Sequence, residues 1–336
     1  MKLRVGVVGL GDAWESRYRL ALRSLADRFE VRAVCAEVAQ RAEQVAQEFG
    51  AIPVDGYRAL SARSDIDAVL MLSSKLYGSL PILAACDAGK AIFCGAALDL
   101  DPQRAQEIKQ RVEASGVAFM SEFPRRHAPA THRLKELIAT RLGPPRVLFC
   151  HLRRAAVIPS TDSQEDEQST ALREIMEMVD WCRYVVGAEP TNVFGTRHFI
   201  AGSTASDYEM MSLDFLPAGA SGTGVMAQIS CGQYLPLAWP EAIGFRPPSA
   251  MQVACENGVA FVDLPATLIW FDDAGRHMES LDNERPVGEQ LLTHFHRAVT
   301  SLVRRTADLE DAYRSLRIVL AARESAQTAQ RILLDL

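Results

Sequence analysis

The first third of the chain alternates short apolar runs with amphipathic stretches. The apolar runs are residues 3–8, 31–35, 51–54, 68–72, 91–94 and 117–120, and amphipathic stretches near 14–28, 39–49 and 80–88 lie between them. A further helix is expected after Asp101, because aspartate is a common N-cap and Pro102 follows it in the first turn. Strand and helix alternating at this spacing predict a parallel sheet built from two nucleotide-binding halves.

The pattern changes from about residue 125 onward. A helix is expected near 131–140, followed by alternating segments at 146–157, 193–199, 208–215, 224–231, 251–255 and 260–262. A long helix, 170–186, separates the first two segments, a helical tail is expected over 288–334, and the polar stretch 160–170 is expected to be a mobile loop. Strands that follow one another without intervening helices predict an open, mainly antiparallel sheet.

These patterns place the chain in the α/β class, with two domains. Residues 1–122 are expected to form a Rossmann dinucleotide-binding domain, and residues 123–336 an α+β domain for substrate binding and oligomerisation. A chain of 336 residues is too long for one ordinary core, since single cores stop growing near about 250 residues. The C-terminal helix is expected to pack back on the first domain.

A glycine-rich loop directly follows the first predicted strand. It reads GLGDAW over residues 9–14, which opens a G-x-G-x-x-G fingerprint with tryptophan in place of the third glycine. The first two glycines allow backbone N–H groups to approach a pyrophosphate at a helix N-terminus. The tryptophan implies a shifted helix or a longer loop. A purely structural turn is the alternative to a cofactor site, whose candidate residues are Gly9, Gly11, Asp12, Ala13 and Trp14.

Further cofactor-binding candidates follow the next strands. Glu37 stands one position later than the acidic residue that usually binds the ribose hydroxyls. A carboxylate there repels a 2′-phosphate, so Glu37 favours NAD over NADP, whereas a solvated glutamate and a protein without bound cofactor remain the alternatives. Ser73 and Ser74, after the fourth strand, and Gly95, after the fifth, complete the set.

Charge and cysteine usage narrow the class of partner. A net charge of −6 argues against binding to a nucleic-acid backbone and favours a small-molecule ligand. Seven dispersed cysteines without a CxxC pair are typical of reduced thiols in a cytosolic protein. The sequence contains no signal-peptide pattern and no run of about 18 apolar residues, so a cytoplasmic protein without a membrane anchor is expected.

No metal site is predicted. His294 and His296 fall on different faces of the expected helix and have no third ligand at metal-binding spacing. Cys94 ends an apolar strand without a basic neighbour, which predicts a buried thiol and not a nucleophile.

The sequence resembles the Gfo/Idh/MocA family, that of glucose–fructose oxidoreductase and inositol dehydrogenase, along nearly its whole length. The resemblance is carried by VGVVGLG, AEQVAQEFGA (42–51), ILAACDAGKAIFC (82–94), ALDLDPQRAQEI (97–108), FPRRHAPATHRLKEL (123–137), RYVVGAEP (183–190) and AARESAQTAQRI (321–332). It implies a Rossmann domain followed by an α+β domain, NAD(P) in the cleft, and a sugar or polyol substrate. Such proteins commonly oligomerise through the open sheet face, so a homodimer or homotetramer is expected.

The catalytic motifs of that family are altered. Family enzymes carry Glu-Lys-Pro after the fifth strand, with a lysine that contacts cofactor and substrate, and residues 95–97 here read Gly-Ala-Ala. The family also places an aspartate and, four residues later, an acid/base histidine on the long helix. These positions fall on Arg173 and Glu177, while a further family aspartate is retained as Asp180.

Two stripes share the long helix. Apolar side chains at 172, 175, 176, 179 and 182 form a core-facing stripe. Arg173, Glu177, Asp180 and Tyr184 form a polar stripe, which in the resembling fold faces the cofactor cleft. In one interpretation these are catalytic, with Glu177 as a base whose pKa burial would have to raise and Arg173 orienting the ligand. The others are a solvated Arg–Glu pair worth about 0.3–0.5 kcal/mol and ligand binding without chemistry.

Three side chains are candidate substrate contacts. Arg125, with Arg126 beside it at the domain junction, matches family residues that line the cleft, although capping of the linker is an equal interpretation. Tyr77 follows the fourth strand and either stacks on a ligand or simply packs. Tyr184 continues the polar stripe of the long helix.

Three functions remain open at this point. The first is an NAD(P)-dependent oxidoreductase acting on a sugar- or polyol-like molecule with a degenerate catalytic set. The second is a non-redox ligand-binding protein on the same fold, since drift after loss of function would remove both protonic groups. The third is an enzyme that holds NAD and cycles it internally.

Overall fold

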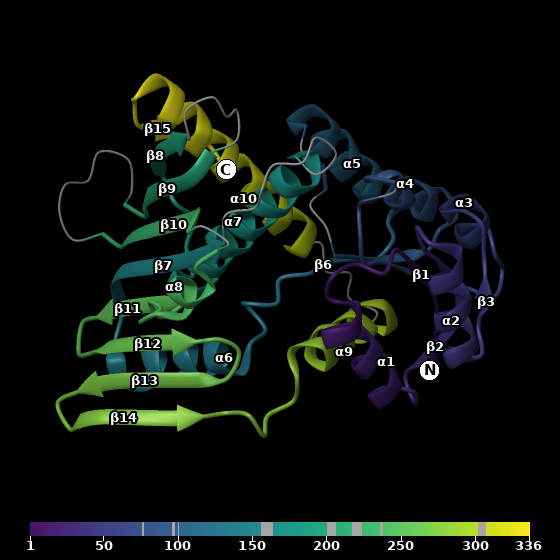
Figure 1. Cartoon of the computed structure of the whole chain (residues 1–336), viewed down its shortest axis with the longest axis horizontal. Helices are drawn as coiled ribbons and strands as arrows, with labels where there is room; N and C mark the ends of the chain where they lie inside the picture. Colours follow the sequence, from purple (N-terminus) through teal and green to yellow (C-terminus); the bar gives the residue numbers. More distant parts are fainter. Residues whose placement is uncertain are drawn as a thin grey trace. The chain divides into compact units, whose positions relative to one another are not determined.

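The chain folds into two compact units. The computed structural model describes residues 1–75, 77–95, 98–99, 101–155, 164–199, 206–216, 224–235, 238–301 and 307–336 (Figure 1). The first unit contains residues 1–124 and 285–313, and the second contains 125–284 and 314–336. The chain therefore enters the second unit after Pro124, returns to the first, and ends in the second.

The first unit is built on a parallel sheet. Its strands are β1 (Leu3–Val8), β2 (Phe29–Cys35), β3 (Ile52–Pro53), β4 (Ala68–Met71), β5 (Ala91–Cys94) and β6 (Phe119–Ser121). They lie in the order β3-β2-β1-β4-β5-β6, and every neighbouring pair is parallel. Strands buried on both faces read as continuous apolar runs, which is why the sequence predicted this sheet.

Helices connect these strands. They are η1 (Trp14–Tyr18), α1 (Arg19–Ser24), α2 (Ala39–Phe49), α3 (Tyr57–Ser61), α4 (Leu80–Asp87) and α5 (Pro102–Ser115). The predicted cap of α5 is confirmed, because the Asp101 carboxylate accepts hydrogen bonds from the backbone N–H groups of Gln103 and Arg104. The short helix α3 was not predicted, since one turn is too short to show an amphipathic pattern.

Helix α9 (Val287–Thr300) belongs to the first unit although it follows the second sheet in the chain. Leu291, Leu292 and Phe295 enter the buried core of the first unit. The ring of Phe295 packs edge-to-face against Phe93 of β5, with 5.6 Å between ring centroids. The core around β5 is therefore completed by a segment distant in sequence.

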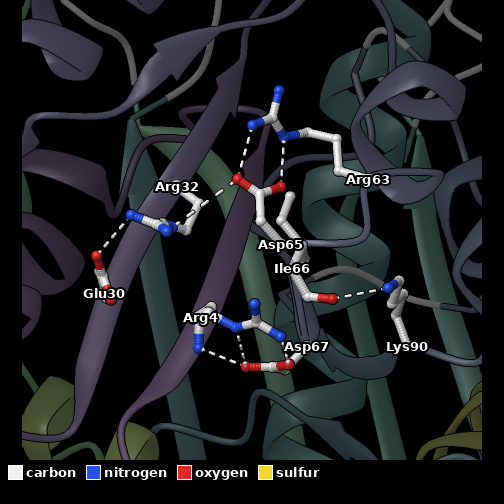
Figure 2. A network of polar contacts seen from close by, with 8 residues as sticks. All are labelled: Arg4, Glu30, Arg32, Arg63, Asp65, Ile66, Asp67 and Lys90. Atoms are coloured by element: carbon white, nitrogen blue, oxygen red, sulfur yellow. Dashed lines mark hydrogen bonds and ion pairs between the residues drawn. The ribbon is translucent and has the colours of Figure 1, made fainter.

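A network of hydrogen bonds and ion pairs connects the strand ends at the amino edge of the parallel sheet (Figure 2). Arg4 of β1 donates two side-chain hydrogen bonds, of 3.0 and 2.6 Å, to the Asp67 carboxylate just before β4. Lys90, just before β5, donates to the carbonyl oxygen of Ile66 at 2.7 Å. The remaining members are Glu30, Arg32, Arg63 and Asp65. This network fixes the amino ends of the strands, while the glycine loop follows the carboxyl end of β1.

The second unit is built on a mixed sheet, which has nine strands in the described part of the chain. They are β7 (Pro145–Ala155), β8 (Asn192–Phe199), β9 (Ser206–Asp214), β10 (Met226–Leu235), β11 (Met251–Cys255), β12 (Val259–Asp263), β13 (Thr267–Asp272), β14 (Gly275–Ser280) and β15 (Ile332–Leu333). Their order is β14-β13-β12-β11-β7-β10-β9-β8-β15. β7 and β10 are parallel and the other neighbours antiparallel, which confirms a mainly antiparallel sheet.

Helices pack against this sheet. They are α6 (Pro129–Leu137), η2 (Ile138–Leu142), α7 (Gln164–Val186), α8 (Pro240–Gly244) and α10 (Ala307–Thr328), of which residues from Arg314 onward belong to the second unit. Cys182 of α7 lies with its sulfur 3.5 Å from that of Cys150 on β7, so α7 packs directly on the centre of the sheet. Of the helices in the described ranges, none is both long and apolar enough to cross a membrane.

The sequence misplaced several elements of the second unit. Helix α7 begins at Gln164, so the loop expected over 160–170 is wrong in its second part, and residues 160–163 lie outside the described residues. Strands β13 and β14 were not predicted. The helical tail expected over 288–334 is two helices, and its end at 332–333 is strand β15, because those residues pair with β8.

Candidate functional site

The glycine loop lies against the segment that follows β4. Gly9 has a φ of 76°, a left-handed conformation that favours glycine, and a Cβ there would stand 2.7 Å from the Cβ of Ser73. A Cβ on Gly11 would stand 2.4 Å from the carbonyl oxygen of Leu72. Both glycines are therefore needed for the close approach of the two segments.

The helix after the loop starts irregularly, as Trp14 in place of the third glycine implies. Residues 14–18 form a π-helical turn, with a hydrogen bond from the backbone N–H of Tyr18 to the carbonyl of Ala13. The Trp14 side chain is fully buried and packs edge-to-face on Phe49 of α2, with ring centroids 6.0 Å apart. The predicted cofactor contact of Trp14 is therefore wrong for its side chain, which belongs to the core.

A small pocket opens beside the loop, within the first unit. It is lined by Leu10, Gly11, Asp12, Ala36, Glu37, Val38, Arg41, Ser73 and Lys75. The structure thus brings together three sequence predictions, namely the glycine loop, the acidic residue after β2 and Ser73. The Lys75 ammonium lies 3.6 Å from the Asp12 carboxylate, so the pocket carries both signs of charge.

The loop presents backbone donors to this pocket. Within the described part of the chain, the N–H groups of Gly11, Asp12 and Ala13 donate to no protein acceptor, whereas those of Gly9 and Trp14 do. Unused N–H groups beside a helix start are the usual binding site for a pyrophosphate. The residues present therefore fit a dinucleotide, since the loop offers N–H donors to its phosphates and Glu37 lines the same pocket.

The segment after β4 contributes packing as well as binding candidates. The carbonyl of Ser74 accepts a hydrogen bond from the N–H of Gly78, which closes a turn. Tyr77 packs edge-to-face on Tyr57 with ring centroids 4.7 Å apart, and the thiol of Cys35 lies 3.9 Å from its hydroxyl oxygen. Burial raises the pKa of the Tyr77 hydroxyl. The packing interpretation of Tyr77 therefore has direct structural support.

Tyr77 also borders a second, larger hollow between α4 and α5, of about 750 Å³. Its other lining residues are Gly78, Ser79, Leu80, Leu83, Asp87, Asp99, Arg104, Glu107, Ile108 and Arg111. Several of these are already paired, since Ser79 donates to Asp99 and Arg111 contacts Asp87. Three acidic and two basic side chains line the hollow, so it offers no concentrated charge of either sign.

A carboxylate that the sequence did not single out lies beside Gly95. Glu122 follows β6 and forms an ion pair with Arg17 of η1. Its Oε2 atom lies 2.8 Å from the position that a Cβ on Gly95 would occupy. Ala96 and Ala97 lie outside the described residues. The carboxyl edge of the parallel sheet therefore holds ionisable groups, although residues 95–97, directly after β5, include none.

In the second unit, Glu177 of α7 lies between two arginines. The Glu177 carboxylate is 3.5 Å from Nε of Arg125 and 3.9 Å from Nε of Arg173. Its side chain and that of Arg125 are each only 15% exposed, whereas Arg173 is 39% exposed. The interpretation as a solvated Arg–Glu pair does not fit Glu177, because its side chain is mostly buried between two guanidinium groups.

Asp180 is a buried anchor. It is 1% exposed, and its carboxylate accepts two hydrogen bonds from Arg126 and lies 3.7 Å from Arg183. An aspartate so enclosed presents no open oxygen to a substrate, so its predicted catalytic role is corrected to positioning. Asp180 holds Arg126, and thereby the segment that carries Arg125.

Tyr184 is half-buried between two cations. The Arg126 guanidinium lies 5.3 Å and the Lys135 ammonium 5.5 Å from its ring centroid. Burial raises the pKa of the Tyr184 hydroxyl and lowers the pKa of Lys135. The structure thus places Arg125, Glu177 and Tyr184 along one side of α7 in the second unit, while the cofactor set lies wholly in the first.

A doubly wound parallel sheet with a glycine loop at its carboxyl edge defines a dinucleotide-binding Rossmann domain. Residues 3–123 match the sequence model of the Gfo/Idh/MocA group, described as an oxidoreductase family with an NAD-binding Rossmann fold. The Rossmann part of the chain is thus similar to the NAD-binding domain of that family.

Individual relatives agree with this assignment. The chain is 32% identical over 177 residues to inositol 2-dehydrogenase 3 of Saccharopolyspora erythraea, a match that spans 52% of each chain, so about half the length of that relative. Among solved structures, levoglucosan dehydrogenase in complex with NADH and levoglucosan aligns with a TM-score of 0.84, 16% identity and complete coverage of both chains. Aldose-aldose oxidoreductase from Caulobacter crescentus aligns over 99% of this chain and 100% of its own, with a TM-score of 0.83 and 14% identity. At these identities the solved structures show a shared fold.

Proposed function

We propose that this protein is an NAD(P)-dependent oxidoreductase that acts on a sugar- or polyol-like small molecule. The observation that carries the proposal is the glycine loop, whose free N–H groups share one pocket with Glu37 and Ser73. The match to an inositol dehydrogenase and the fold shared with a levoglucosan dehydrogenase support a carbohydrate-like substrate. A bound nicotinamide would supply the hydride acceptor.

The finer part of the proposal is a preference for NAD over NADP. Glu37 lines the pocket and is exposed, so its charge opposes a 2′-phosphate on the adenosine ribose. Arg41 and Lys75 line the same pocket, and Lys75 is already within 3.6 Å of Asp12. Selectivity between NAD and NADP thus depends mainly on the opposite charges of Glu37, which repels a 2′-phosphate, and Arg41, which attracts it.

For catalysis, we assign Glu177 as the proton acceptor. Oxidation of a carbinol removes a hydride from carbon and a proton from the hydroxyl oxygen, and Glu177 would take that proton. Arg173 would orient the ligand, and Arg125 holds the carboxylate. Because two guanidinium groups favour the ionised carboxylate, we expect slow turnover. The same feature favours the second candidate function, a ligand-binding protein without redox chemistry.

Turnover with a panel of sugars, inositols and sugar acids, each with both nicotinamide cofactors, tests this proposal. We expect measurable oxidation that falls by about 10²–10⁴ in Glu177→Gln, the usual range for loss of a general base. Glu174→Gln is a matched control, since Glu174 lies on the same helix and pairs with Arg154 at 2.7 Å. Binding of cofactor and ligand without turnover would instead establish the non-redox function.

We also propose a cytoplasmic homo-oligomer. All seven cysteines are free thiols in the structure, which supports a reducing compartment. One face of β13 and β14 presents apolar side chains, with Phe271 40% and Met278 61% exposed. Ile269 and Met278 are register partners, so these residues share a face on which a second copy would bury apolar surface.

A further inference from the structure

The Arg17–Glu122 ion pair lies at the carboxyl edge of the parallel sheet. Arg17 belongs to η1, which follows the glycine loop directly, and Glu122 follows the last strand. The backbone N–H of Glu122 donates to the carbonyl of Cys94 at 2.8 Å, so this residue extends the pairing of β5 and β6 past the end of β6. Ligands of doubly wound sheets bind outside the carboxyl ends of the strands. The pair is therefore on the ligand-binding side of the sheet.

Gly95 provides the space that the Glu122 carboxylate occupies. A Cβ on Gly95 would stand 2.8 Å from Oε2 of Glu122, closer than real Cβ contacts allow. The glycine is also held in place, because its N–H donates to the carbonyl of Met71 at 2.7 Å. Glu122 thus places a carboxylate, from the neighbouring strand, where a side chain on residue 95 would lie.

This carboxylate has unused hydrogen-bonding capacity. Its side chain is 8% exposed, and its Oε1 atom accepts from Arg17. No described residue donates to Oε2. The Tyr18 hydroxyl nearby is also buried without a hydrogen-bond partner, although Glu122 is close enough to influence its pKa, which burial raises. Buried polar groups are normally hydrogen-bonded, so the unpartnered Tyr18 hydroxyl, with Glu122 beside it, indicates a polar ligand at this edge of the sheet.

We propose that Glu122 is a cofactor-contacting residue whose Oε2 atom accepts a hydrogen bond from the nicotinamide half of the dinucleotide. Arg17 is a positioning residue, which holds the carboxylate in place through their ion pair. Arg17 is itself held by α9, because Gly288 allows that helix to approach the Arg17 backbone. This inference rests on the proposed function, since it requires that the Rossmann unit binds a dinucleotide. The Glu122 carboxylate thus supplies a hydrogen-bond acceptor at the carboxyl edge of the sheet, where Gly95 has no side chain.

Equilibrium titrations with NADH and with ADP test the inference. ADP carries the adenosine and pyrophosphate but lacks the whole nicotinamide half, so it reports only on the glycine loop and its pocket. We expect Glu122→Gln to weaken NADH binding about tenfold or more and to change ADP binding less than twofold. The matched control is Glu48→Gln, which removes another mostly buried carboxylate paired with arginines in the same unit and should leave both affinities unchanged.

A second variant guards against a folding artefact. Gly95→Ala places a methyl group against Oε2 and should weaken NADH binding, but not ADP binding, as Glu122→Gln does. The double variant should bind NADH only slightly more weakly than either single variant. Equal losses for NADH and ADP, or no loss for NADH, would overturn the inference. Wild-type protein that binds ADP but not NADH would overturn it as well, and failure to bind either ligand would overturn the proposed function together with it.

Discussion

At the residue scale, the pocket beside the glycine loop contains the charges that decide cofactor choice. Glu37 and Arg41 are both exposed and belong to the same stretch of chain at the start of α2. A 2′-phosphate would be repelled by the first and attracted by the second. Single charge-neutralising substitutions here should therefore change selectivity without disturbing the core.

Glu37→Gln is expected to narrow the preference for NAD over NADP by about tenfold or more, because removal of a like charge a few ångströms from the phosphate relieves repulsion. Arg41→Gln should change the ratio in the opposite direction. The measurement is the ratio of dissociation constants, with Glu43→Gln, an exposed residue of the same helix, as control. An unchanged ratio in Glu37→Gln would show that this side chain does not face the ribose.

Substitution of Gly11 is a poorer test of cofactor binding in the pocket than the sequence alone suggests. The sequence predicts that valine at this position removes cofactor binding and leaves the fold intact. A Cβ there would collide with the carbonyl oxygen of Leu72, so Gly11→Val would also displace the segment after β4. Loss of binding in that variant would therefore not separate a cofactor contact from a packing defect.

At the element scale, the amino edge of the parallel sheet depends on ionic contacts between strand ends. The Asp67 carboxylate joins β1 to β4 through Arg4, and this hydrogen-bonded cation holds the pKa of Asp67 below its usual value. A depressed carboxylate pKa stabilises the fold above the pKa of the unfolded chain. That contribution is lost as the pH falls through the folded value.

Asp67→Asn is expected to lower the thermal midpoint at neutral pH, and the difference from wild type should shrink below about pH 4 as the wild-type carboxylate protonates. Thermal unfolding between pH 3 and pH 7 measures this. The control is Asp27→Asn, because Asp27 is 72% exposed and lies 3.6 Å from its arginine partner. A difference that stays constant down to pH 3 would contradict the ionic account.

The sequence predicted the first sheet well and the second less completely, for physical reasons. Strands buried on both faces appear in the sequence as apolar runs. The start of α5 could be predicted because Asp101 is a typical N-cap residue. Strand β14 is largely exposed and carries no such run, while β15 exists through pairing with β8, far away in sequence. Glu122 was not predicted because it approaches Gly95 only in the folded sheet, where the ends of two neighbouring strands meet. No local sequence motif marks this contact.

At the scale of the whole molecule, the exposed face of β13 and β14 predicts self-association. Phe271→Glu with Met278→Glu should reduce the oligomer to smaller species at micromolar concentration, because burying unpaired charge in an apolar interface is costly. Sedimentation velocity measures the change. Leu20→Glu is the control, since Leu20 is also exposed, at 60%, but lies in the first unit. A monomeric wild type, or an unchanged oligomer in the double variant, would refute the proposed interface.

The Rossmann unit of this chain is expected to hold a nicotinamide dinucleotide over its glycine loop. Titration of the intact protein with NADH, followed by the nicotinamide fluorescence and by competition with ADP, tests it most directly. We expect saturable binding with a dissociation constant between about 1 µM and 1 mM, the range usual for enzyme ligands, and displacement by ADP. Absence of saturable binding up to about 1 mM NADH would contradict it.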